Sequence, residues 1–364
     1  MTVDQRSTAT ANFPALSYAL AVTDPASFVI QLRSALLSVG FFNLTEIEQV
    51  IPDWHSRWNE AFQASAAFFQ LPVEEKNQIA MCNSRHFRGY AGTKEEVTAG
   101  LPDWREQIDF GPDAEQPALP YPPPPLAPIE LSLYGPNLYP SKPAGFETAI
   151  RTYRAATTQI AEKLVHLIGQ SLSPEPELFA NLFLETEDRR DPPYARLKVV
   201  RYPPVEAGEK GFGVGAHRDG GGLTLLAQDE SGGLQVQTWD GAWIDVPPVP
   251  HALVINVGQV LERMSAGSYP ATTHRVLQTR RPTPRISIPF FFSPPLTTQL
   301  VPLRVEQLHE ELRAYVEGTR RGEVVSEVGK GDLHAEVYGV SAWKGIKRSH
   351  KPVWEKYYRL YDFE

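Results

Sequence analysis

The sequence predicts an α+β protein in which a β core in the middle of the chain is flanked by helices on both sides. Three observations support this. Short apolar segments recur at close intervals between residues 194 and 292, and glycine, proline and aspartate separate them. Helical periodicity dominates the first 180 residues and returns near Val305–Arg320. Many short strands joined by tight turns are typical of a sandwich or jelly roll, not of a parallel sheet.

The N-terminal region, residues 1–185, is expected to be mainly helical. Asp24-Pro25 supplies a helix N-cap and a proline at the first helical position, and apolar residues then recur at helical spacing. A bulky segment at 41–44 suits a buried strand. A second helix is predicted from about 53 to 70, because its aromatic residues follow one stripe that suits a core.

A proline-rich segment and a long helix lead into the β core. Prolines crowd the segment from Pro112 to Pro143, and they exclude an interior helix or a central strand there. We expect an ordered extended segment beside the core. A helix follows from about Phe146 to Leu172. Strands are then predicted at 196–202, 211–217, 222–228, 233–237, 242–246, 252–257, 272–279 and 285–292.

We expect the whole chain, 1–364, to fold as one cooperative unit, since the β core needs helices to cover its faces. Its regions are the N-terminal helical part at 1–185, the β core at 186–300 and a helical C-terminal tail at 301–364. The tail includes a helix near 352–358. A monomer or a weak homo-oligomer is the expected state.

The composition is typical of a globular protein and argues against several other classes. Of 364 residues, 42% are hydrophobic and 21% are charged, which argues against general disorder. The formal net charge of −8 argues against a nucleic-acid partner. The single cysteine, Cys82, excludes an internal disulfide and a cysteine-based zinc cluster. No secretory signal or apolar run of about 20 residues is visible, so we expect a cytoplasmic protein without a membrane partner.

Two pairs of polar residues and one further histidine are the candidates for chemistry. His217 and Asp219 are two residues apart, so their side chains would point to the same side of a strand and could bind one metal ion. Alternatively, they could be a pair at the end of a strand that forms hydrogen bonds with the backbone. His274, on another predicted strand, completes a set of two histidines and one carboxylate that suits Fe(II), O₂ and a co-substrate. Arg285 and Ser287, again two apart, form a fork for a carboxylate.

This order of residues resembles the 2-oxoglutarate and Fe(II)-dependent dioxygenases, and more narrowly their isopenicillin N synthase-like branch. The segment from Glu95 to Asp103 is also similar to the ethylene-forming enzymes of this branch. Further matches cover most of the chain: Phe13-Pro14, Arg88-Gly89-Tyr90, Asp103-Trp104-Arg105-Glu106, Arg201-Tyr202-Pro203, Gly258–Glu262 and Thr273–Val276.

The resemblance implies a double-stranded β-helix, or jelly-roll, core. It implies that Fe(II) is bound by His217, Asp219 and His274. It also implies that Arg285 and Ser287 bind the distal carboxylate of 2-oxoglutarate, and that oxidation with O₂ releases succinate and CO₂. The seven other histidines are interpreted as surface or packing residues: His55, His86, His166, His251, His309, His334 and His350.

Residues of the substrate pocket follow from period-two counting and the resemblance. Tyr202 matches a tyrosine that assists the carboxylate fork, or it belongs to the core. Lys198 and Val200 share its side of the strand, and Phe291 shares the side of the fork. Lys198 could meet an acidic group, or be a solvated or salt-bridged lysine. Glu96 could meet a cationic group, or lie in a charged surface loop.

The substrate is expected to be a small molecule, such as an amino acid or an intermediate of secondary metabolism. Hydroxylation is the default outcome, and the same residues would serve desaturation, ring closure or fragmentation of the co-substrate. Two alternatives remain open. One is an isopenicillin N synthase-type oxidase that works without 2-oxoglutarate, and the other is a non-catalytic jelly-roll binding protein.

Overall fold

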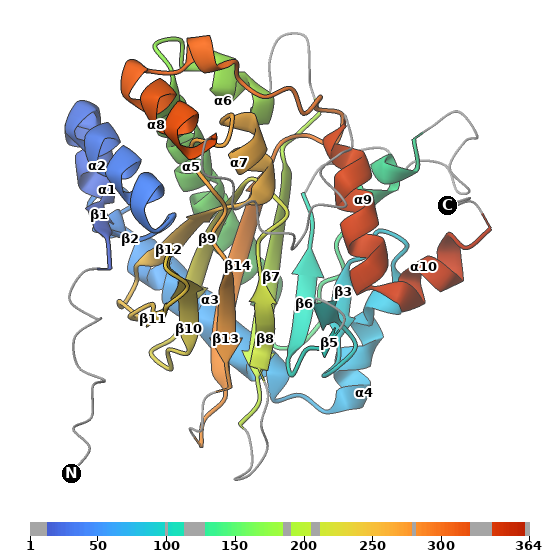
Figure 1. The fold of residues 1–364 in the computed structure, drawn as a ribbon. Coiled ribbons are helices and arrows are strands. Elements are labelled where there is room, and N and C mark those ends of the chain that lie inside the picture. The colour runs from blue at the N-terminus through green and yellow to red at the C-terminus, as the bar shows by residue number, and fades with distance from the viewer. Residues whose placement is uncertain are drawn as a thin grey trace, which may run out of the picture.

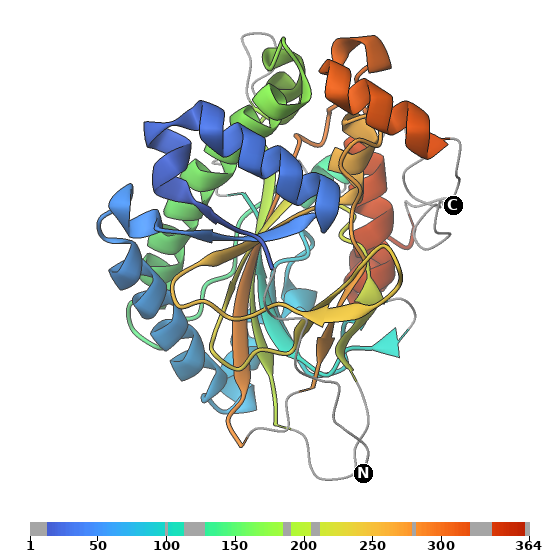
Figure 2. The same cartoon turned by 60° about the vertical axis from the view of Figure 1, so that its left-hand side comes forward.

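The computed structural model describes residues 13–98, 101–112, 128–184, 191–204, 212–278, 282–320 and 337–360. Two facing sheets form a jelly-roll core (Figures 1 and 2). The larger sheet contains β1 (Ala15–Ser17), β2 (Phe41–Thr45), β3 (Gly89–Ala91), β6 (Glu106–Phe110), β7 (Tyr194–Tyr202), β9 (Leu223–Gln228), β12 (Leu253–Val257) and β14 (Arg285–Ser293). The smaller sheet contains β8 (Phe212–His217), β10 (Leu234–Gln237), β11 (Trp243–Asp245) and β13 (His274–Leu277). A separate hairpin pairs β4 (Val97–Thr98) with β5 (Leu101–Pro102).

Within the described residues the larger sheet runs in the order β1-β2-β12-β9-β14-β7-β6-β3, and the smaller in the order β11-β10-β13-β8. Only β1 and β2 pair in parallel among the described strands. The larger sheet therefore takes strands from the N-terminal region as well as from the core that the sequence predicted, which is consistent with an α+β jelly roll.

Helices cover the outer side of the larger sheet, where α5 contacts β9 and β14 and packs against two other long helices, α2 and α3 (Figure 1). None of the described helices is both long enough and apolar enough to span a bilayer. The helices are α1 (Tyr18–Thr23), α2 (Pro25–Ser38), α3 (Trp54–Phe69), α4 (Val73–Lys76), α5 (Phe146–Leu172), α6 (Glu177–Phe183), α7 (Gln259–Met264), α8 (Glu310–Arg320), α9 (Tyr338–Ser349) and α10 (Lys351–Tyr357). Short 3₁₀ helices lie at Ile47–Gln49, Asn77–Ile79, Met81–Asn83, Ile129–Leu133 and Val305–Gln307.

Strand β7 shows how the larger sheet separates two apolar cores. Leu197 and Val199 belong to the cluster shared with the helices. Val200 and Tyr202 belong to a second cluster, which includes Val276 of the smaller sheet. Alternation along a strand sends neighbouring side chains to opposite faces, so the two clusters lie on opposite sides of the sheet. We call the face toward the smaller sheet the inner face.

Most elements lie where the sequence predicted them. The Asp24 side chain caps α2 by accepting from Ser27 N at 3.1 Å, and α5 has the predicted bounds. The sequence did not predict strands β3, β4, β5 and β6 or the helices α1, α4, α6, α7 and α9. All five residues of β6 are buried, including Glu106, Gln107 and Asp109, so no apolar alternation marks it.

The proline-rich segment is only partly described, because residues 113–127 lie outside the described residues. Its remaining part packs on the body of the protein. Tyr134 contacts Tyr194 edge to face at 5.9 Å, and Tyr139 stacks on Phe110 at 4.9 Å between ring centroids. Residues 128–143 thus pack beside the larger sheet, and a 3₁₀ helix at Ile129–Leu133 interrupts the extended segment that the sequence predicted.

Candidate active site

The fold brings His217, Asp219 and His274 together at one end of the smaller sheet. His217 ends β8, His274 begins β13, and the two are direct partners across these strands. Asp219 follows two residues after β8, and its Oδ1 lies 3.6 Å from Nε2 of His217 and 3.5 Å from Nε2 of His274. All three ligand atoms lie within 4.8 Å of one another, and no other such group was found among the described residues.

Neighbouring groups orient each of these side chains. Nδ1 of His217 lies 2.8 Å from the Gly215 carbonyl oxygen, and Nδ1 of His274 lies 3.1 Å from that of Thr272. An Nδ1–H that donates to a carbonyl leaves the Nε2 lone pair available for a metal. Asp219 Oδ2 accepts from Thr224 Oγ1 at 2.7 Å and from Asn256 Nδ2 at 2.8 Å, which leaves Oδ1 facing both Nε2 atoms.

The start of α7 anchors the loop that carries Asp219. The Gln259 backbone N–H donates to the Asp219 carbonyl oxygen at 2.8 Å, and the Gly258 N–H donates to that of Gly222 at 2.7 Å. A Cβ at Gly258 would lie 2.3 Å from the Gly221 carbonyl oxygen, so this close approach requires glycine.

The protonation states of His217 and Asp219 favour the binding of a cation. Burial and the neighbouring His274 lower the pKa of His217 to about 4, so its imidazole is neutral at neutral pH. Burial alone would raise the pKa of Asp219, but the two histidines and its hydrogen bonds hold that pKa below its usual range. Two imidazole nitrogens and one carboxylate oxygen form a donor set that fits Fe(II) and leaves positions open.

Arg285 offers a second binding group on the inner face. The residue is 1% exposed, and its Nη1 donates to Ser287 Oγ at 3.3 Å, Nη2 to Gln228 Oε1 at 3.1 Å and Nε to the Gly232 carbonyl oxygen at 2.8 Å. Its guanidinium lies 4.8 Å from the centroid of the Tyr202 ring. In the described part of the chain no carboxylate pairs with it, and Gln228 Nε2 is buried without a hydrogen-bond partner. A carboxylate would satisfy both groups.

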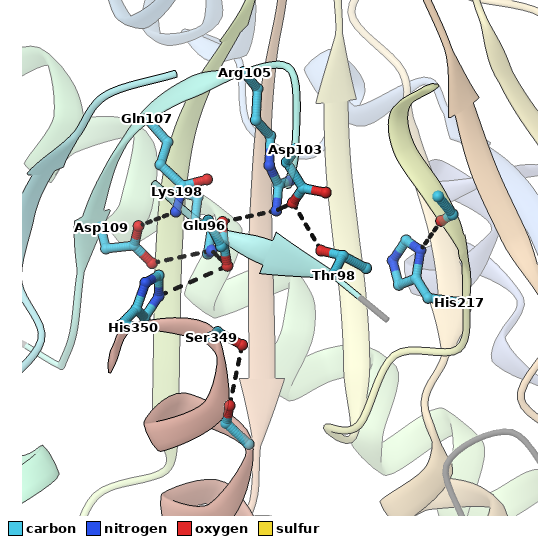
Figure 3. A network of polar contacts seen from close by, with 12 residues as sticks. Glu96, Thr98, Asp103, Arg105, Gln107, Asp109, Lys198, His217, Ser349 and His350 are labelled. Atoms are coloured by element: carbon cyan, nitrogen blue, oxygen red, sulfur yellow. Dashed lines mark hydrogen bonds and ion pairs between the residues drawn. The ribbon is translucent and has the colours of Figure 1, made fainter. Parts of the chain in front are cut away.

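Lys198 and Glu96 are brought together in a buried polar network (Figure 3). Lys198 Nζ lies 2.7 Å from Glu96 Oε1 and 3.4 Å from Asp109 Oδ1. Arg105 Nη2 lies 2.7 Å from Glu96 Oε2 and 2.8 Å from Asp103 Oδ2. The charged-surface-loop alternative is wrong for Glu96, because the residue is 8% exposed. The salt-bridged alternative is what the structure shows for Lys198.

The network adds functional candidates that sequence reasoning missed, namely Arg105, Asp109 and His350. Nε2 of the buried His350 lies 3.7 Å from Glu96 Oε1, which attaches the junction of α9 and α10 to the network (Figure 3). Strand β4 also contacts β8, the strand that ends in His217. A buried, charged cluster beside a metal triad is a signal that the linear sequence does not carry.

The other predicted pocket residues lie on the inner face. Val200 is buried in the cluster between the two sheets, directly across from Ser287. Phe291 is the partner of Arg196 on one side and of Thr224 on the other. Because Thr224 bonds Asp219, Phe291 stands close to the level of the triad.

Comparisons with known proteins identify the family. The 2OG-Fe(II) oxygenase superfamily model matches residues 194–294, and the model for the non-haem dioxygenase in morphine synthesis N-terminal region matches residues 13–142. A 2-oxoglutarate-dependent dioxygenase of Gibberella zeae is 34% identical over 298 residues, which span 77% of this chain and 74% of that protein. The chain belongs to the 2-oxoglutarate and Fe(II)-dependent oxygenase superfamily. The resemblance seen in the sequence is thereby confirmed, and Fe(II), 2-oxoglutarate and O₂ are the cofactor and co-substrates of this oxygenase.

Further relatives and solved structures support this family. A homoarginine-6-hydroxylase of Arabidopsis thaliana is 32% identical to this oxygenase over 288 residues, spanning 77% of this chain and 80% of that protein. The crystal structure of a 2OG-Fe(II) oxygenase family protein from Caulobacter crescentus matches with a TM-score of 0.65 and 26% identity, over 86% of this chain and 99% of that one. A Neurospora crassa protein solved with alpha-KG and 5-formyluracil has the same fold, with a TM-score of 0.64 and 22% identity, over 83% and 90% of the two chains.

Proposed function

We propose that this oxygenase oxidises a small organic metabolite, with Fe(II) held by His217, Asp219 and His274 and 2-oxoglutarate held by Arg285 and Ser287. The observation that carries the proposal is the buried Arg285, which has no acidic partner among the described residues although it shares the inner face with the triad. When bound, iron and 2-oxoglutarate supply the oxidising chemistry and release succinate and CO₂.

The protein's own residues position these groups and exclude water. The backbone acceptors of Gly215 and Thr272 hold the two imidazoles with Nε2 directed at Asp219. The Tyr202 ring covers the guanidinium of Arg285. Apolar side chains of the cluster between the sheets, such as Val200, surround the region with low-dielectric walls, which strengthen the interaction between a guanidinium and a carboxylate.

The substrate is proposed to be an amino acid or an intermediate of secondary metabolism, and hydroxylation is its proposed fate. Lys198, Glu96, Phe291 and Val200 are proposed to line its binding region, which their shared place near the triad supports. The name of one relative, a homoarginine-6-hydroxylase, supports an amino-acid substrate. A protein of the same fold was solved with 5-formyluracil, which supports a small-molecule substrate in general. The larger sheet contains strands from the N-terminal region and from the β core, which supports a chain that folds as a single cooperative unit. We also propose that the protein is cytoplasmic, is a monomer or a weak homo-oligomer, and has no nucleic-acid partner.

The proposal is tested by measuring O₂-dependent succinate release from 2-oxoglutarate with Fe(II), in the presence of a metabolite mixture. We expect release by the wild-type protein and none by His217→Ala. His166→Ala is the matched control, because the His166 side chain is 46% exposed on the surface. Equal release by the wild type and His217→Ala would contradict the assignment, and so would a wild type that never consumes 2-oxoglutarate.

A further inference from the structure

Arg196 is a cation of the inner face that the proposed function does not use. It lies on β7 and alternates in phase with Lys198 and Tyr202, so it shares their face. Its guanidinium lies 5.8 Å from the ring centroid of Tyr194 and 5.5 Å from that of Phe291. The side chain is half-buried. The nearby charges of Asp109 and Glu96 favour its cationic form, but Arg196 makes no hydrogen bond or ion pair with any residue that the structure describes.

Three other cationic side chains near the triad already have a partner or a proposed ligand. Lys198 is shared by Glu96 and Asp109, and Arg105 by Glu96 and Asp103. Arg285 is assigned to 2-oxoglutarate. Ring contacts hold the flat guanidinium of Arg196 in place without using its N–H donors, which remain available for a planar acceptor.

Arg196 also stands at the level of the metal triad. It is the strand partner of Phe291, which is in turn the partner of Thr224. Thr224 Oγ1 donates to Asp219 Oδ2 at 2.7 Å. Neighbouring strands lie about 4.8 Å apart, so the backbones of Arg196 and Thr224 are separated by about 10 Å. A small molecule bound to Arg196 could therefore reach the metal ligands.

We infer that the substrate of this oxygenase carries a carboxylate that pairs with Arg196, which makes Arg196 a specificity-determining residue. The inference rests on the proposed function and names its substrate class. A monoanion fits better than a phosphate dianion, because Glu96, Asp103 and Asp109 already outnumber Lys198 and Arg105 in the neighbouring network. Phe291, opposite Arg196, would then contact the apolar body of the substrate.

The test uses a panel of small carboxylic acids, each paired with its primary amide and, where one exists, its phosphate monoester analogue. Binding is measured anaerobically, by the change that each compound makes to the visible band of the Fe(II)–2-oxoglutarate protein. Turnover is measured as succinate release. The proteins are the wild type, Arg196→Gln, Arg196→Lys and the control Arg201→Gln. Arg201 lies on the same strand but pairs with Glu106 on the other face, at 2.5 Å.

We expect the best acids to bind the wild type about ten- to a hundredfold more tightly than their amides, since a charge-assisted hydrogen bond is lost with the amide. Arg196→Gln should bring acid and amide to equal affinity, Arg196→Lys should keep part of the preference, and Arg201→Gln should keep all of it. Affinity for 2-oxoglutarate should be the same in every variant.

Three results would overturn the inference. They are a panel in which no acid is bound more tightly than its amide, a preference for the phosphate analogue, and an acid preference that survives in Arg196→Gln. Failure of the proposed function looks different, because the visible band would then not form when 2-oxoglutarate is added. A band that forms without any preference for acids rejects the Arg196 inference alone.

Discussion

Lys198 Nζ lies 2.7 Å from Glu96 Oε1, and this buried ion pair joins two segments that are 102 residues apart in the chain. The sequence suggested that Glu96 could meet a cationic substrate group, and that Lys198 could meet an acidic group or form a salt bridge. The structure shows that they pair with each other, with Arg105 on the far oxygen of the same carboxylate. The pair therefore shapes the inner face beside the triad and fastens the β4–β5 hairpin to the larger sheet.

Removing one partner of this pair should be costly. Lys198→Met leaves Glu96 and Asp109 buried with less positive charge, and we expect the free energy of unfolding to fall by about 3–5 kcal/mol. The double variant Lys198→Met/Glu96→Gln should lose less than the sum of its single variants. Urea denaturation measures all three. As a control, Lys142→Met at an exposed pair with Glu75 should cost less than about 1 kcal/mol, and additive losses at 198 and 96 would contradict the coupling.

The sequence predicted those parts of the structure in which the type and spacing of side chains indicate a single local structure. The apolar periodicity of α5 and the strand pattern of β14 predicted their positions. The residue types and order of His217, Asp219 and His274 predicted a metal site, and the structure brings these three side chains together. The sequence was insufficient for β6, whose polar residues are buried because distant partners neutralise them. Glu106 bonds Lys76 and Arg201, and such long-range pairing cannot be read from local sequence.

The same limit applies to the site. Arg285-x-Ser287 is visible as a fork in the sequence, whereas Gln228, which completes it, lies 57 residues away and has no distinctive spacing. His350 was grouped with the packing histidines, and its contact with Glu96 depends on α9, which was not predicted. His334 lies outside the described residues.

Thr224 should tune metal affinity without being a ligand. Thr224→Val keeps the side-chain shape and removes the hydroxyl that bonds Asp219 Oδ2. Because partners of metal ligands fix their orientation, we expect the Kd for Fe(II) to rise about ten- to a hundredfold in an anaerobic titration. Thr157→Val removes an equally buried hydroxyl from α5 and should leave the Kd unchanged. An unchanged Kd in Thr224→Val would show that Asn256 alone orients the carboxylate.

Arg285→Lys should weaken 2-oxoglutarate binding selectively. Lysine keeps the charge but loses the planar fork that now contacts Ser287 and Gln228. We expect the KM for 2-oxoglutarate to rise at least about tenfold, with the Kd for Fe(II) unchanged, measured by succinate release and by anaerobic titration. Arg275→Lys is the control, since Arg275 stacks over Trp243 at 3.9 Å and alternates out of phase with His274. A KM that stays at the wild-type value would remove Arg285 from the co-substrate site.

Acid should destabilise the fold through His86. The residue is 5% exposed, and its Nδ1 lies 2.7 Å from the Ser132 carbonyl oxygen. Burial lowers its pKa despite this hydrogen bond, whereas an unfolded histidine titrates near about 6.5. The unfolded chain therefore binds the proton first, so the stability contributed by neutral His86 is complete above about pH 6.5 and is lost as the pH falls toward the lowered folded pKa.

His86→Asn removes the titrating group and retains a donor near the position of Nδ1. Between pH 7.5 and 5.5, the free energy of unfolding should fall by about 1 kcal/mol more in the wild type than in His86→Asn. The measurement is urea denaturation with EDTA, which keeps metal binding out of the comparison. His166→Asn, on the exposed His166, should retain the wild-type slope. Parallel slopes for the wild type and His86→Asn would show that His86 protonates equally in both states, and that its burial carries no acid sensitivity.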